Sequence, residues 1–175
     1  MKVAEMAERI EQNLQLLTAR LPEIPVLSIM LCRMTIQLGR EMSAMFEQRI
    51  RPSGLTEAEF RVLTMLFSQA NGTAHPGDLC AGAGQSPANM SRISDALVDR
   101  ALITRVLSSE DRRRMVLRIT EKGETLVREL LPSMWRPLKE MMRDFPESEQ
   151  RQMLTLLKRM GGIMDAAAMP KEESA

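Results

Sequence analysis

Residues 86–120 read SPANMSRISDALVDRALITRVLSSEDRRRMVLRIT. Ser86 is a good helix N-cap, and Pro87 suits the first helical position after it. Apolar residues then recur at helical spacing, and short polar side chains fall on the opposite side. These polar residues are Asn89, Ser91 and Arg92. The stretch therefore predicts a short helix with one buried face and one exposed polar face.

A second short helix is expected just before this one. Residues 76–84 read PGDLCAGAG, in which Pro76 opens the segment and Gly84 suits a tight turn. Two short helices joined by a glycine turn, the second with a polar face, are typical of a helix-turn-helix.

The chain after this motif predicts a β-hairpin. Residues 103–107 and 115–119 are strand-like, and the connection between them, SSEDRRR, is polar and rich in arginine. A hairpin with a charged tip, placed directly after a helix-turn-helix, is a wing.

The polar helix and the wing together indicate DNA binding. An α-helix fits the major groove, where Asn89 could pair with adenine and Arg92 could reach guanine or a phosphate. Ser86 and Ser91 suit phosphate oxygens near the helix N-terminus. The alternative for Arg92 is a surface salt bridge with a neighbouring acid on its own helix, Asp95 or Asp99.

The wing arginines are Arg112, Arg113 and Arg114. Arginine at a wing tip can enter the narrow minor groove, but strand alternation keeps all three from pointing the same way. We expect one or two of them to contact DNA; the alternative is a solvated run of charge. Residues 86–122 hold eight basic and five acidic residues, whereas the whole chain carries a net charge of only +1.

Local signals also mark helix ends and weak points outside this motif. Thr56 and Glu59 form a capping box at the start of a helix. Either Pro132 or Pro137 should kink the long helix that Thr120 caps, and residues 161–162, both glycine, should weaken the last helix.

Helices are expected on both sides of this centre. Residues 26–50 are apolar on two faces, so this helix either lies deep in its own domain or is covered by a second subunit. We predict a mainly α fold with a small β-hairpin wing (α+β), a winged helix-turn-helix flanked by N- and C-terminal helices. The expected regions are 1–50, 55–120, 121–168 and a disordered tail at 169–175.

Several functional classes are disfavoured by the sequence. His75 is the only histidine, and no catalytic or metal-ligand spacing surrounds it, so we expect neither an enzyme nor a cofactor. The charged N-terminus is not a signal peptide, and the most apolar stretch, residues 26–32, is too short to cross a bilayer. We expect a cytoplasmic protein with no membrane partner.

Two segments carry a family resemblance. LTEAEFRVLTML (55–66) and SRISDALVDRALITRVLSSEDRRRMVLRITEKGETL (91–126) resemble the MarR family of winged-helix regulators. HPGDLCAGAGQSPANMSRI (75–93) and ITEKGETLVRELLP (119–132) are most similar to its multidrug-efflux repressor branch.

The resemblance implies an obligate homodimer whose N- and C-terminal helices interlock. Two recognition helices roughly 34 Å apart would then read an inverted-repeat operator in double-stranded DNA. It further implies repression of an efflux operon, relieved by a small lipophilic or phenolic effector bound between the dimer helices and the DNA-binding lobe. The candidate pocket residues are Arg33, Gln37 and Met65.

Cys32 suggests an alternative, a redox-sensing regulator of the same family. Its placement before residues 40–42 resembles that of the sensing cysteine in the organic-peroxide branch. That branch holds its cysteine with tyrosines, and this chain contains none. Cys32 is otherwise interpreted as a small apolar core residue.

A further alternative is a module that uses its helical flanks to bind a protein partner and does not bind DNA. This alternative would leave the arginine-rich wing unexplained.

Overall fold

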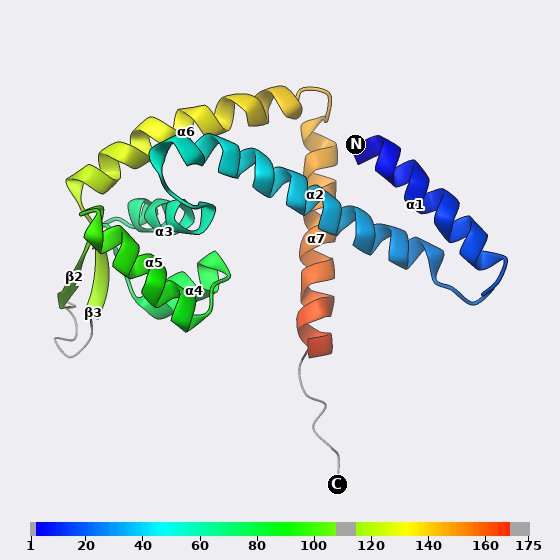
Figure 1. Ribbon diagram of the computed structural model, residues 1–175, viewed down its shortest axis with the longest axis horizontal. Coiled ribbons are helices and arrows are strands. Elements are labelled where there is room, and N and C mark those ends of the chain that lie inside the picture. The colour runs from blue at the N-terminus through cyan, green and yellow to red at the C-terminus, as the bar shows by residue number, and fades with distance from the viewer. Residues whose placement is uncertain (1–2, 108–114, 169–175) are drawn as a thin grey trace, which may run out of the picture. The chain divides into compact units, whose positions relative to one another are not determined.

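The computed structural model describes residues 3–107 and 115–168 (Figure 1). Helices dominate the described residues, and the strands are short. The helices are α1 (Val3–Thr18), α2 (Val26–Ile50), α3 (Glu57–Ser68), α4 (Pro76–Ala83), α5 (Pro87–Asp99), α6 (Glu121–Met141) and α7 (Glu147–Ala168), with a 3-10 turn η1 (Arg51–Ser53). The strands are β1 (Thr73–Ala74), β2 (Ile103–Leu107) and β3 (Met115–Ile119). The predicted mainly α fold with a β-hairpin wing is confirmed.

The chain divides into two compact units, and the boundary falls inside α6. The first unit ends at Leu131 and the second begins at Pro132. A proline inside a helix removes one backbone hydrogen bond and crowds the preceding turn. Both Pro132 and Pro137, at which a kink was predicted, lie within α6.

The N-terminal helices leave much apolar surface uncovered. α1 packs against α2, and Leu14 of α1 is buried. In α2, however, the last residue, Ile50, is the only buried one. Leu27 is 82% exposed and Leu31 is 55% exposed. Within the described residues, α2 therefore does not lie deep in its own domain.

The central lobe, residues 55–120, is built from α3, α4, α5 and a three-stranded antiparallel sheet. The strand order is β1-β3-β2, and Ile103 pairs with Ile119 in the hairpin. β1 was not predicted, because a strand of two residues shows no alternation. The core of the lobe is apolar; its largest fully buried side chains include Leu63, Leu66, Leu79, Met90, Leu97 and Ile103.

The start of α3 follows its sequence signal. The amide of Glu59 donates to Oγ1 of Thr56 at 3.2 Å, and the amide of Thr56 donates to Oε2 of Glu59 at 2.8 Å. This reciprocal pair is the predicted capping box and satisfies two amides that the helix leaves open.

The first half of α6 is fixed to the lobe. Thr120 caps the helix by accepting from the amide of Gly123 at 3.1 Å. Gly123 lies so close to the chain after α5 that a Cβ there would be 2.3 Å from the carbonyl oxygen of Leu102. One turn further on, the guanidinium of Arg128 lies 4.8 Å from the ring centre of Phe67 on α3, a cation–π contact.

α7 contains no buried residue among those whose side chains are described. Most of its large apolar side chains are exposed; these are Met153, Leu154, Leu156, Leu157, Ile163 and Met164. The helix continues through Gly161 and Gly162, which were expected to weaken it. Among the described residues, no helix is long and apolar enough to cross a membrane.

Candidate nucleic-acid interface

The turn between α4 and α5 has the predicted form. Gly84 adopts a left-handed conformation with φ of 63°, which favours glycine. Ser86 then caps α5, and its Oγ accepts from the amide of Asn89 at 3.3 Å. Because the Ser86 side chain is exposed and capping uses only its acceptor side, its hydroxyl hydrogen remains available to a phosphate oxygen.

α5 presents the expected polar face. Met90, Ile93 and Leu97 are buried, whereas Ser91 and Arg92 are exposed. Asn89 is half-buried in the first turn of the helix. The apolar stripe fixes the orientation of the helix, so the short polar side chains lie on the side available to a ligand.

Arg92 makes no hydrogen bond or ion pair with another described residue. Asp95, one of its two expected partners, is instead paired with Arg105 of β2. Asp99, the other, forms no ion pair within the described residues. Among the described residues, Arg92 is therefore not paired with an acid of its own helix, as the alternative interpretation expected.

Arg105 is a functional candidate that the sequence interpretation missed. It pairs with Leu117 across the hairpin. A groove of about 440 Å³ separates α4 and α5 from the hairpin. The groove is lined in part by Cys80, Met90, Ser91, Ser94, Arg105 and Leu117. Alternation along β2 would have placed Arg105 on the same face as the buried Ile103, which was the available signal.

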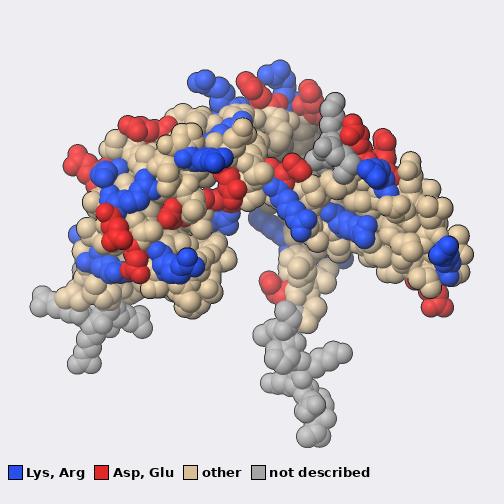
Figure 2. Space-filling view, viewed as in Figure 1, with Lys and Arg blue, Asp and Glu red and all other residues tan. Residues whose placement is uncertain are grey.

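The three wing arginines, Arg112, Arg113 and Arg114, lie outside the described residues. β2 and β3 are paired as far as Leu107 and Met115, which lie opposite each other. Figure 2 shows basic and acidic side chains intermingled on the surface of the lobe that holds β2 and β3.

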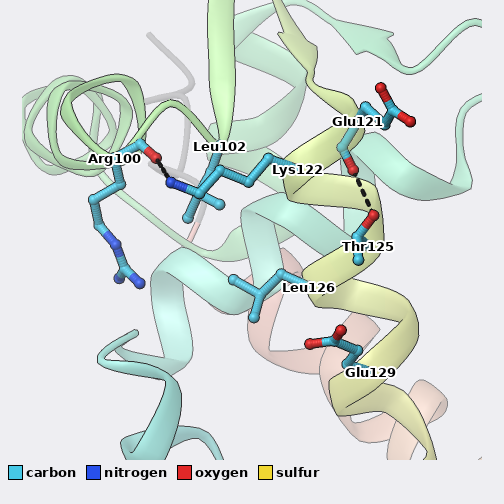
Figure 3. Close-up of a pocket in the computed structure, with 7 residues that line it drawn as sticks. All are labelled: Arg100, Leu102, Glu121, Lys122, Thr125, Leu126 and Glu129. Atoms are coloured by element: carbon cyan, nitrogen blue, oxygen red, sulfur yellow. Dashed lines mark hydrogen bonds between the residues drawn. The ribbon is translucent and has the colours of Figure 1, made fainter.

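Arg100 ties the end of α5 to the connector before α3. Its guanidinium donates to the carbonyl oxygens of Ser53 and Gly54, both at 2.8 Å. Its own carbonyl accepts from Nζ of Lys122 on α6, also at 2.8 Å (Figure 3). These bonds join three elements around the C-terminal end of α5, so its position is coupled to the connector and to α6.

The candidate effector residues are placed on two elements. Arg33 is exposed on α2, and Gln37 one turn later donates to Glu41 at 2.7 Å. Met65 on α3 lies over Gly82 of α4, where an added Cβ would be 2.2 Å from its terminal methyl. Three grooves among the described residues of the first unit are lined by other residues. Effector binding by these three residues stays a prediction.

The two cysteines occupy different settings. Cys32 is exposed on α2, not part of a core within this chain, and forms no hydrogen bond with another described residue. Cys80 is half-buried and lines the groove beside α5. Among the described residues, no group of three or more His, Cys, Asp or Glu could hold a metal ion.

A helix-turn-helix with an open polar face, followed by a β-hairpin, defines a winged helix-turn-helix DNA-binding protein. A profile described as "MarR family" matches residues 53–114. The transcriptional repressor MprA of Escherichia coli (strain K12) is 32% identical over 167 residues, which cover 90% of this chain and 95% of that protein. The chain belongs to the MarR family.

Solved structures share the fold. Sco3205, a MarR family transcriptional regulator from Streptomyces coelicolor in complex with DNA, matches with a TM-score of 0.68 and 18% identity, covering 83% of this chain and 90% of that one. CouR from Rhodococcus jostii RHA1, bound to p-coumaroyl-CoA, matches with a TM-score of 0.66 and 22% identity, and the match covers 71% of this chain and 86% of that one. At these identities the likeness establishes the fold.

Proposed function

We propose that this protein is a homodimeric, cytoplasmic transcriptional repressor that binds an inverted-repeat operator and is released by a small effector. The observation that carries the proposal is the open polar face of α5, where Arg92 has no described partner while Asp95 is paired with Arg105. An arginine left free beside exposed Ser91 is available to phosphate or base edges. MprA, 32% identical, is named a transcriptional repressor.

The dimer is supported by the exposed apolar surface of the flanking helices. α2 has one buried residue among 25, and α7 has none among its described side chains. Apolar surface of this extent is unfavourable in water and marks an interaction site. We therefore assign residues 1–50 and 121–168 to dimerisation and residues 55–120 to DNA binding.

The effector is proposed to be a small lipophilic or phenolic compound, and the regulated operon to encode multidrug efflux. The efflux assignment follows the resemblance of residues 75–93 and 119–132 to that branch of the family. CouR, which shares the fold, was solved with p-coumaroyl-CoA, whose acyl group is a phenol. An effector must bind the released state more tightly than the DNA-bound state to shift the equilibrium.

Gel shift tests the DNA-binding part of the proposal. The probe is a duplex that the wild-type protein selects from a random-sequence pool. Replacing both Arg92 and Arg113 with alanine should abolish the specific shift. Retention of a full-strength specific shift would contradict the assignment of α5 and the wing as the DNA-contacting surface.

The means of release is tested on the same complex. Titration with 4-hexylphenol should dissociate it in both the wild type and a Cys32→Ser variant. Release by cumene hydroperoxide but not by the phenol, together with loss of that release in Cys32→Ser, would replace the effector proposal with the redox alternative.

A further inference from the structure

Gln85 occupies the turn of the helix-turn-helix and is held at both its backbone and its side chain. Its amide donates to the carbonyl of Cys80 at 2.9 Å, which closes the end of α4. Its side-chain Nε2 donates to the carbonyl of Ala83 at 3.2 Å. The residue is half-buried, so its carboxamide has a fixed plane and a fixed direction.

The free oxygen of that carboxamide is directed at the recognition helix. Oε1 of Gln85 accepts a hydrogen bond from Nδ2 of Asn89, four residues later. Asn89 is itself anchored, because its backbone amide donates to the capping oxygen of Ser86. The chain of bonds from Ala83 through Gln85 to Asn89 thus fixes an otherwise rotatable side chain in the first turn of α5.

This chain of bonds distinguishes the two ends of the Asn89 carboxamide. Rotating that group by 180° would set its oxygen against the oxygen of Gln85, two acceptors without a hydrogen between them. In the observed orientation, Asn89 keeps Oδ1 as an acceptor and one Nδ2 hydrogen as a donor. Those are the two groups that pair with N6 and N7 of adenine in the major groove.

We propose that Gln85 is a positioning residue for base recognition, which holds Asn89 in the orientation that reads adenine. The inference rests on the proposed function, since it requires α5 to lie in the major groove. Gln85 acts through Asn89 and need not touch DNA itself. Without it, the Asn89 amide can turn and accept other bases, so selectivity falls more than affinity.

The test measures binding to the selected duplex and to its single base-pair substitutions, by competition gel shift. Asn89→Ala should lower discrimination about tenfold at one A·T pair in each half-site. Gln85→Leu, which removes the acceptor, should lower discrimination severalfold at that same pair and leave the other positions unchanged. Gln85→Glu keeps an acceptor for Asn89 but loses the donor to Ala83, so it should retain more of the base preference than Gln85→Leu does. Its added negative charge should also weaken binding to every sequence alike.

A double variant separates positioning from a structural role. Adding Gln85→Leu to Asn89→Ala should cause no further loss at that base pair, because the residue acts only through Asn89. The inference is overturned if Gln85→Leu weakens all sequences equally, if the two losses add, or if Asn89→Ala leaves every preference intact. If the wild-type protein selects no duplex, the proposed function itself fails, and that outcome is distinct from these three.

Discussion

Arg105 on β2 forms an ion pair with Asp95 on α5, and this pair links the wing to the recognition helix. Both side chains are partly open to solvent, at 41% and 56%. Exposed pairs of this kind contribute only about 0–1 kcal/mol to stability. The main consequence of the pair is electrostatic, because it engages Asp95, three residues after Arg92 on α5, while Arg92 has no described partner.

Arg92→Ala should weaken DNA binding without loss of stability, since the side chain is exposed and has no described partner. If Arg92 contacts a phosphate, the slope of log affinity against log salt should fall by about one; if it reads a base, discrimination at that position should fall by about 1–3 kcal/mol. Fluorescence anisotropy across a salt series distinguishes the two. The matched control is Arg61→Ala, which removes an arginine paired with Glu57 on α3 and should leave binding unchanged.

Asp95→Asn should have the opposite effect on binding. The change removes a negative charge from α5 and releases Arg105, so affinity for non-specific DNA should rise, and the slope of log affinity against log salt should become steeper by about one. The melting temperature should change little because the broken pair is exposed. Asp144→Asn removes a similarly exposed acid outside the lobe and serves as the control. Equal gains in DNA affinity in both variants would contradict the prediction, because they would show that affinity depends only on net charge.

Two glycines predict contrasting effects on stability. Gly123→Ala sets a Cβ 2.3 Å from the backbone carbonyl of Leu102, which cannot move without shifting the chain after α5. It should lower the free energy of unfolding by about 1–3 kcal/mol. Gly82→Ala meets only the flexible end of Met65, and the gain of about 1 kcal/mol in helix propensity should offset its displacement. Urea denaturation measures the free energy of unfolding of both variants. A greater loss of this free energy in Gly82→Ala than in Gly123→Ala would contradict the prediction.

The exposed face of α7 predicts a self-association interface. Leu156 and Ile163 are seven residues apart on one helical face and are 56% and 61% exposed. Replacing both with glutamate should convert the protein from dimer to monomer in sedimentation velocity. Gln152→Glu adds a charge at an exposed polar position of α7 and should leave the dimer intact. A double variant that sediments as a dimer would exclude this face from the interface.

Features with local causes were predictable from the sequence. The Ser86 cap and the Thr56 capping box depend on residues no more than three positions apart, and both were found as predicted. The hairpin followed from two apolar runs on either side of a polar connection. α7 was interpreted less well, because two glycines cost only about 1 kcal/mol each, too little to end a long helix of strong helix formers.

Features that depend on tertiary structure were not predictable. Arg105 and Asp95 are ten positions apart and meet only because β2 folds back beside α5. The bond between Gln85 and Asn89 requires the helix-turn-helix geometry, even though the residues are close in sequence. Met65 was assigned to an effector pocket by resemblance alone, and that assignment stays a prediction; its half-buried side chain lies over Gly82.

In-vitro selection from a random-sequence duplex pool tests the central claim most directly, because it needs no knowledge of the operator. A homodimer with one recognition helix in each protomer should enrich an inverted repeat whose half-sites are about 10 base pairs apart, centre to centre. The enriched duplex should bind two protomers and should lose its specific shift in the Arg92→Ala, Arg113→Ala double variant. Failure to enrich any sequence, or enrichment of a single half-site bound by one protomer, would contradict the account.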